Sequence, residues 1–79
     1  MSAHRIYVAS SCIAAMAFSA EEGILQLEFR NGLTYEYFDV PAEIYTQLCS
    51  AESKGAFVTR FIRGHFSFRR LPRSDVLTQ

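Results

Sequence analysis

Two neighbouring segments of the chain alternate between apolar and polar side chains. The apolar positions are Leu25, Leu27 and Phe29 in the first segment, and Leu33, Tyr35 and Tyr37 in the second. A period of two is typical of β-strands that turn one face toward a core. The pair Asn31-Gly32 lies between the segments and favours a hairpin turn. The pattern therefore predicts two antiparallel strands joined by a tight turn.

The length of this turn decides which side chains share a face, and two closures compete. A two-residue turn would place Glu36 among the apolar residues. A three-residue loop at 30–32, with Gly32 left-handed in a bulge, pairs Leu27 with Tyr35 instead. That register gives one apolar and one polar face, and a slip by one residue would invert both. We therefore expect the three-residue loop, with both tyrosines mostly buried.

A third strand is expected at residues 11–18, before a four-residue hairpin loop at residues 20–23. Across this loop the expected pairs are Phe18 with Leu25, Met16 with Leu27, and Ala14 with Phe29. All of these residues fall on the face that the other hairpin already assigns to the core. The agreement between the two hairpins predicts a three-stranded antiparallel meander.

A helix is expected from Pro41 to about Glu52. Proline suits the first helical position, and the residue before a proline avoids helical angles, so Val40 is the expected cap. An apolar stripe follows at helical spacing. It consists of Ile44, Leu48 and Ala51, flanked by Tyr45 and Cys49.

A second, shorter helix is expected between Ser53, whose side chain can cap it, and Gly64. Its apolar side comprises Phe57, Val58, Phe61 and Ile62. Arg60 and Arg63 are expected on the opposite side of this helix, exposed to solvent.

Residues 65–71 alternate again and predict an extended arm, with Phe66 and Phe68 facing one way and Arg69 the other. The expected fold is therefore α+β: a three-stranded antiparallel β-meander with two helices packed on one face (β-β-β-α-α), followed by an extended basic arm. With 79 residues the chain is expected to form one domain, over residues 8–71. Residues 1–7 and 72–79 are expected to be frayed termini.

The charged residues divide the chain into two unequal parts, although the formal net charge is zero. Residues 1–53 contain seven of the eight acidic residues and only two basic ones, Arg5 and Arg30. Residues 54–74 contain six basic residues and no acidic one. Such a local excess of positive charge favours an anionic partner.

Several classes of function find no support in the sequence. Cys12, Cys49, His4 and His65 lack the spacing of a metal site, and the serines and cysteines have no visible His-Asp companions. We expect no enzyme activity, no metal and no cofactor. Residues 5–20 resemble a signal peptide, but Ser10 and Ser11 interrupt the apolar run. No segment is long enough to span a membrane, and the two unpaired cysteines favour the cytoplasm.

A set of short motifs between residues 8 and 71 resembles the KTSC domain. They are Ser10-Ser11, Tyr35-x-Tyr37, Val40-Pro41, residues 51–55 (AESKG), and Ile62-Arg63-Gly64 followed by alternating aromatics. The family is named for its occurrence at the C-terminus of some lysyl-tRNA synthetases, and also occurs as a small stand-alone bacterial protein. The resemblance implies a role in RNA binding, with no established reaction.

The chain departs from the family pattern at four positions. Cys12 and Thr59 stand where asparagine is common, and Phe66 and Phe68 stand where tyrosines are frequent. These departures put in doubt any role of those side chains in hydrogen bonding, whereas a role in packing would survive.

The function expected from the sequence is a small accessory module that weakly binds RNA, with tRNA as one candidate, through the basic C-terminal helix and arm. Its expected nucleic-acid-binding residues are Lys54, Arg60, Arg63, His65, Phe66, Phe68, Arg69 and Arg70. The cations would contact phosphates, and a phenylalanine would stack on a base. The alternative is a protein-interaction module, such as a homodimer, that uses Ile13 and Phe38 on the outer face of the sheet and binds no nucleic acid.

Overall fold

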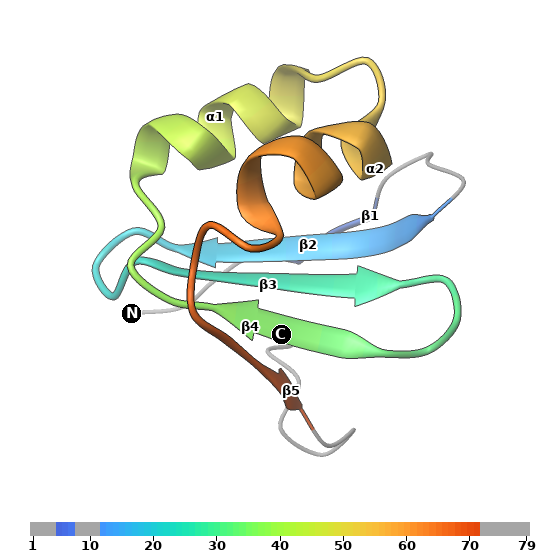
Figure 1. The fold of residues 1–79 in the computed structure, drawn as a ribbon, viewed down its shortest axis with the longest axis horizontal. Helices are drawn as coiled ribbons and strands as arrows, with labels where there is room; N and C mark the ends of the chain where they lie inside the picture. Colours follow the sequence, from blue (N-terminus) through green and yellow to red (C-terminus); the bar gives the residue numbers. More distant parts are fainter. Residues whose placement is uncertain (1–4, 8–11, 72–79) are drawn as a thin grey trace.

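The computed structural model describes residues 5–7 and 12–71, which form an antiparallel sheet with helices over one face (Figure 1). The strands are β1 (Arg5–Tyr7), β2 (Ile13–Ser19), β3 (Ile24–Phe29), β4 (Thr34–Tyr37) and β5 (Phe68–Leu71), and they lie side by side in chain order. Between β4 and β5 come α1 (Ala42–Ser50), α2 (Lys54–Phe57) and a π-helical turn, η1 (Val58–Ile62). This arrangement confirms the predicted α+β class, with its meander and its helices on one face.

The hairpin between β3 and β4 has the predicted three-residue loop. Leu27 pairs with Tyr35, and Leu25 pairs with Tyr37. The Phe29 N–H donates to the Leu33 carbonyl over 2.8 Å. Gly32 takes a φ of 92°, a left-handed conformation that favours glycine because it has no Cβ. The bulged register is therefore confirmed.

The hairpin between β2 and β3 follows the prediction for most of its length. Phe18 pairs with Leu25 and Met16 with Leu27, but the register shifts between Ile13 and Ala15. This bulge inserts one residue, so Ile13 takes the place opposite Phe29 that was expected for Ala14. Ile13 is fully buried in the core, and its predicted exposure on the outer face is wrong.

Two short edge strands extend the predicted meander. Arg5–Tyr7, which was expected to be frayed, pairs with β2 as β1. Phe68–Leu71, which was expected to be a free arm, pairs with β4 as β5. In both cases an edge strand gains hydrogen-bond partners for backbone groups that would otherwise face water. The expectations for residues 1–4, 8–11 and 72–79 lie outside the described residues.

The helix α1 begins and ends slightly inside its predicted bounds. Pro41 is extended (φ −67°, ψ 150°) and acts as the cap, so the helix begins at Ala42 rather than at Pro41. It ends at Ser50 because Ala51 returns to an extended conformation. Leu48 is fully buried, and the ring of Tyr45 stacks on Phe18 with 4.8 Å between centroids. These contacts hold α1 against the sheet.

The second helix is capped as predicted but does not keep helical spacing throughout. The Ser53 hydroxyl accepts a hydrogen bond from the Ala56 N–H over 3.2 Å. Farther on, the Arg63 N–H donates to the Val58 carbonyl over 2.8 Å, which closes a wider π-type turn. Each residue of this turn rotates the chain by less than an α-helical step. Three residues after the buried Val58, the chain has not returned to its core-facing side, so Phe61 is 45% exposed and its predicted burial is wrong.

The core lies between the sheet and the helices and is made of aliphatic side chains and one tyrosine. Its buried members are Ile13, Met16, Leu25, Leu27, Tyr37, Val40, Leu48, Val58 and Ile62. None of the helices in the described part of the chain is both long and apolar enough to cross a membrane.

Candidate nucleic-acid interface

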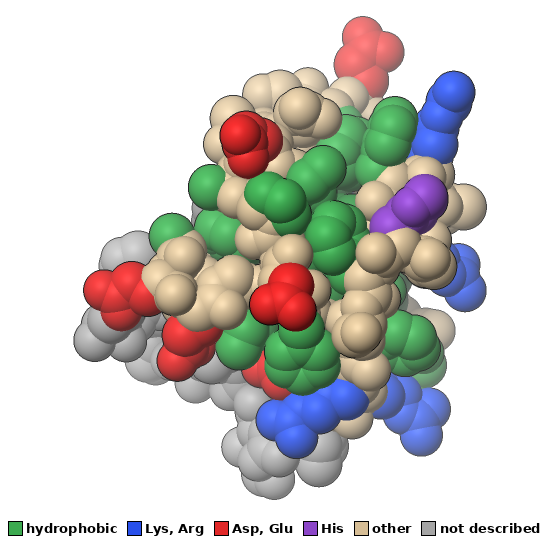
Figure 2. Space-filling model, turned by 60° about the vertical axis from the view of Figure 1, so that its left-hand side comes forward, with side chains coloured by type: hydrophobic (Ala, Val, Ile, Leu, Met, Phe, Trp, Pro, Cys, Tyr) green, Lys and Arg blue, Asp and Glu red, His purple; other side chains and the backbone are tan. Residues whose placement is uncertain are grey.

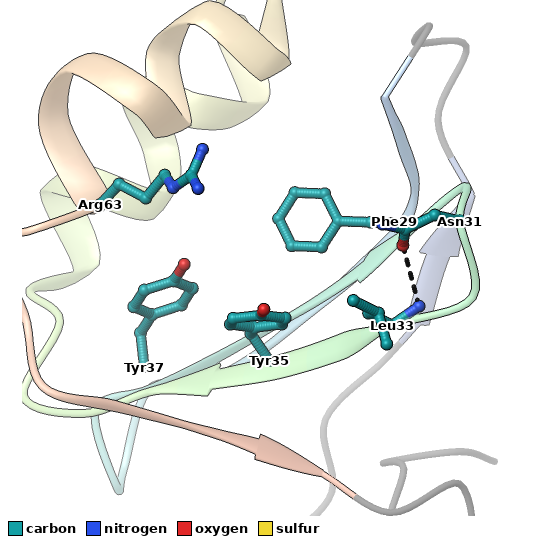
Figure 3. A pocket seen from close by; sticks show the side chains of 6 residues that line it. All are labelled: Phe29, Asn31, Leu33, Tyr35, Tyr37 and Arg63. Atoms are coloured by element: carbon teal, nitrogen blue, oxygen red, sulfur yellow. Dashed lines mark hydrogen bonds between the residues drawn. The ribbon is translucent and has the colours of Figure 1, made fainter.

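A pocket with a volume of about 160 Å³ opens where the β3–β4 hairpin meets the end of η1. Its lining residues are Phe29, Asn31, Leu33, Tyr35, Tyr37 and Arg63. In Figure 3 the two tyrosines stand on β4, Phe29 lies beside them, and Arg63 reaches over them from the end of η1. The alternation of the strands creates this arrangement, because Tyr35 and Tyr37 both point to the helix side of the sheet.

The aromatic rings form a continuous row from the pocket to the surface of β5. Phe29 meets Tyr35 edge to face, with 5.6 Å between centroids. Tyr35 in turn stacks on Phe68 at 5.4 Å, and Tyr37 lies against the same ring at 5.7 Å. Tyr37 is 2% exposed, whereas Phe68 is 54% exposed. One end of the row is therefore core, and the other end offers a ring face to solvent.

Arg63 lies at the mouth of the pocket rather than on the solvent side of its helix. The residue leaves the helix in an extended conformation, and its guanidinium comes close enough to influence the Tyr37 hydroxyl. Burial raises the pKa of Tyr37, and the charge of Arg63 offsets part of that rise. Tyr37 therefore keeps its proton at neutral pH and can donate a hydrogen bond. Arg63 is exposed as expected, but it lines the pocket, so the expectation that it points away from the apolar side is wrong.

Two of the predicted cations have structural partners. The Lys54 Nζ donates to the Ala51 carbonyl over 2.8 Å, bridging the end of α1 and the start of α2. The Arg69 Nε donates to the Glu36 Oε1 over 2.9 Å, across β5 and β4. The side chain of Glu36 is only 10% exposed, so Arg69 neutralises a carboxylate that lies mostly out of water. Neither cation is fully available to a ligand.

The other predicted site residues lie outside the lining of the pocket. Arg70 pairs with Tyr35 across β5 and β4, so both side chains leave the same face of the sheet. Arg60 is exposed on η1, with its guanidinium carbon 5.6 Å from the centre of the Phe61 ring. His65 is exposed in the turn before β5, and Phe66 packs partly against the core.

The predicted set is thus brought together only in part. The structure gathers Arg63, Phe68 and Arg70 beside the pocket, with Arg60 farther back on η1. It adds Asn31 and Tyr35, which the list of site residues did not include. The Tyr35-x-Tyr37 alternation predicts two rings on one face, and their expected burial favours a role in packing.

The surface charge follows the division seen in the sequence. Figure 2 shows the basic side chains of this view along its right and lower edges, whereas most of the acidic ones lie at the left and centre. Within the described residues, no three His, Cys, Asp or Glu side chains gather as metal ligands would. The arrangement offers aromatic faces and guanidinium groups, which can bind a planar, anionic ligand.

Comparisons with known proteins place this arrangement in a family. The model of the KTSC domain matches residues 9–66. A protein of Tsukamurella paurometabola is 42% identical over 59 residues, covering 75% of this chain and 88% of the relative. A lysine–tRNA ligase of a Nostoc species is 39% identical over 61 residues, and the matched region is 77% of this chain but only 11% of that enzyme.

The fold has a counterpart among solved structures. The crystal structure of a KTSC domain protein from Yersinia pestis is similar to this chain with a TM-score of 0.86 and 33% sequence identity, and the match covers 90% of this chain and 100% of that one. Both the family model and this structure agree with the resemblance found in the sequence motifs. The chain belongs to the KTSC domain family.

Proposed function

We propose that this chain is a non-catalytic, cytoplasmic accessory module that binds single-stranded RNA weakly, at the pocket and along β5. The observation that carries the proposal is the half-exposed ring of Phe68, which stacks on Tyr35 beside Arg63 and Arg70. An aromatic face flanked by cations is the usual combination for single-stranded nucleic acid, because bases stack and phosphates need positive charge. Neither Cys12 nor Cys49 forms a disulfide within the described residues, which agrees with a reducing compartment.

The supply of aromatic and basic groups limits the proposed affinity. A base that stacks on an aromatic side chain contributes about 1–3 kcal/mol. Arg60 and Arg70 are the exposed cations best placed for phosphates, because Lys54 and Arg69 already bind protein groups. Two phosphate contacts and one or two stacked bases favour weak binding with modest sequence preference.

The carboxylate of Glu36 does not oppose this proposal. Glu36 lies on the outer face of the sheet, where a free carboxylate would repel phosphate. It is 8% exposed as a whole residue and paired with Arg69, so little of its charge reaches the surface. One relative is a lysine–tRNA ligase, an enzyme that charges tRNA with lysine. The first RNA to test is therefore tRNA.

Salt dependence tests the proposal directly. Binding of a single-stranded RNA should weaken as salt rises, and each phosphate contact contributes about 0.7 to the slope of log affinity against log salt. Arg60→Gln and Arg70→Gln should therefore each reduce that slope by about 0.7. Fluorescence anisotropy of a labelled RNA at four or five salt concentrations measures the slope.

Lys54→Gln is the matched control, because it removes one positive charge whose amino group is bound to Ala51. It should leave the slope unchanged, and circular dichroism should show all three variants folded. Folded variants of Arg60 and Arg70 with the slope of the unmodified protein would remove these two residues from the site. Absence of RNA binding at low salt would overturn the proposal and favour the protein-interaction module. That module was expected to dimerise through Ile13 and Phe38, and Ile13 is buried in the core.

A further inference from the structure

We infer that this site binds two neighbouring nucleotides whose bases are splayed apart, with one base in the pocket and the next on the exposed ring of Phe68. The RNA that fits is therefore a loop, a bulge or another unstacked segment, rather than a duplex or a stacked single strand. This inference rests on the proposed function and names the class of RNA that the same site takes.

The pocket has room for one ring system. Pockets for drug-sized ligands measure about 300–1,000 Å³, and this one measures about 160 Å³. The rings of Phe29, Tyr35 and Tyr37 line it, and Arg63 reaches over the tyrosines (Figure 3). Such rings can hold a flat group by stacking or by edge contacts. A single base therefore suits the pocket better than a stacked pair of bases.

The second aromatic surface lies on the neighbouring strand, on the far side of the tyrosines. Because β3, β4 and β5 lie side by side, Phe29, Tyr35 and Phe68 follow one another across the sheet. Tyr35 contacts both neighbours, with 5.6 Å to the centroid of Phe29 and 5.4 Å to that of Phe68. Phe68 is 54% exposed and does not line the pocket. One ring is therefore available to a base outside the pocket.

The ring of Tyr35 keeps the two bases from stacking on each other. Successive stacked bases lie about 3.4 Å apart along a strand. A base against Tyr35 in the pocket and a base on the exposed side of Phe68 have both rings between them, and the centroids of these rings alone are 5.4 Å apart. The strand must therefore open one stacking step to occupy both places. A strand within a duplex cannot do so without losing base pairs.

The polar groups at the pocket favour no particular base. Asn31 and Arg63 are exposed groups that can donate hydrogen bonds, and the tyrosine hydroxyls can donate or accept them. Each of the four bases carries at least one hydrogen-bond acceptor. Selection therefore acts on the conformation of the strand, because a base that is already unpaired and unstacked avoids the cost of opening.

One cation is placed for the backbone between the two nucleotides. Arg70 pairs with Tyr35 across β5 and β4, and it leaves the same face of the sheet as Phe68, two residues earlier on the strand. Its guanidinium can therefore meet the phosphate that joins the base in the pocket to the base on Phe68. The splayed strand turns this phosphate toward the protein surface.

Two bulged duplexes test the class of RNA. One carries a bulge of two uridines, and the other carries two abasic nucleotides at the same place, so length and charge are equal. By fluorescence anisotropy, the unmodified protein should bind the uridine bulge at least about fivefold more tightly, the lower end of what one stacked base contributes. Equal affinity for the two duplexes would overturn the capture of bases from an unstacked segment.

An oligoadenylate of four nucleotides tests the splayed conformation itself. Its adenines stack in solution, and the stacked strand gives a strong circular dichroism signal in the near ultraviolet, where the protein contributes little. This signal should fall when the protein saturates the strand, because at least one stacking step opens. An unchanged signal at saturation would overturn the splayed conformation and leave RNA binding in place.

Phe68→Leu and Phe61→Leu form a matched pair, because both change an exposed phenylalanine. Phe68→Leu should weaken binding of the uridine bulge at least about fivefold and keep the slope against salt, since the ring carries no charge. Phe61→Leu should change neither, because Phe61 contacts Phe57 and lies outside the lining of the pocket. A folded Phe68→Leu variant with unchanged affinity, or an equal loss in both variants, would overturn the role of Phe68.

The NMR signals of the Phe68 ring in the unmodified protein give the same test without a substitution. They should move upfield when the uridine bulge is added, because a stacked base shields the ring, and signals that stay in place would overturn the contact. Failure to bind any of these RNAs at low salt would overturn the proposed function, and this inference with it. Binding that ignores both the bulged bases and the stacking of the strand would overturn this inference alone.

Discussion

At the scale of single residues, one position along the chain separates a core side chain from a surface one. Ile62 is fully buried, and its neighbour Phe61 is 45% exposed, although the side chain of Phe61 has the larger apolar surface. Hydrophobicity alone could not distinguish them, since both fit an apolar helix face at α-helical spacing. The π-type turn that ends at Arg63 selects Ile62 for the core.

This selection gives the first stability prediction. Ile62→Ala should lower the free energy of unfolding by about 2–5 kcal/mol, because it deletes buried methyl groups and leaves a cavity. Phe61→Ala should cost only about 0.5–1.5 kcal/mol, mostly from the lost ring contact with Phe57, whose centroid lies 4.8 Å away. Urea unfolding of both variants provides the comparison. A larger loss for Phe61→Ala would mean that the helix packs with ordinary α-helical spacing.

The candidate site shows the same limit of prediction from residue types. Basic and aromatic residues between 54 and 70 could be identified as a group, because no acidic residue lies between Glu52 and Asp75. Which of them face a ligand depends on contacts made at a distance in sequence. Arg69 meets Glu36 across two strands, and Arg63 lines the same pocket as Tyr37 across the sheet–helix boundary. Neither contact has a local sequence signal.

At the scale of elements, the turn residues and the alternation of apolar and polar side chains were sufficient to predict the two central hairpins. The left-handed Gly32 and the pairing of Leu27 with Tyr35 follow from both signals together. The bulge near Ile13 could not be predicted, because its alanine-rich strand has no residue that demands one. The edge strand β1 is only three residues long, which is too short for periodicity to reveal. Alternation over residues 65–71 predicts the extended conformation of β5 but carries no signal for its pairing with β4.

The glycine that ends the helical segment allows a test of one element boundary. Gly64 has a φ of 79°, and an added Cβ would meet no atom within 4 Å. Gly64→Ala should therefore destabilise the protein by about 1–2 kcal/mol through backbone strain alone. Gly64→Asn should cost less, because asparagine tolerates the left-handed region. Thermal unfolding of the two variants measures the difference. If Gly64→Ala melts at the same temperature as the unmodified protein, the chain leaves η1 in another conformation.

At the scale of the whole molecule, β5 joins the basic segment to the sheet. Residues 68–71 pair with β4, so the last described residues of the basic segment belong to the fold rather than to a free arm. Two members of the candidate site, Phe68 and Arg70, therefore stand on a strand held at the edge of the sheet. The pocket and the exposed ring of Phe68 keep a fixed relation only while β5 stays paired.

Hydrogen exchange can measure how firmly β5 is held. The amides of Leu25 and Leu27 lie in the central strand β3 and should exchange only on global unfolding, whereas the hydrogen-bonded amides of β5 should exchange sooner, because a short edge strand opens locally. Arg69→Gln removes the charge-assisted bond to Glu36, worth about 1 kcal/mol for a half-exposed pair. It should therefore speed exchange in β5 by about fivefold and leave β3 unchanged if global stability is matched with denaturant.

Arg70→Gln is the control for this last experiment, because it changes the neighbouring arginine on the same strand, outside the bond to Glu36. It should leave exchange in β5 as it is in the unmodified protein. Equal acceleration by both variants would show that positive charge in general, rather than the Arg69–Glu36 bond, holds the strand. Exchange in β5 at the rate of an unstructured peptide would restore the free arm expected from the sequence, and the RNA site would then assemble only when the ligand binds.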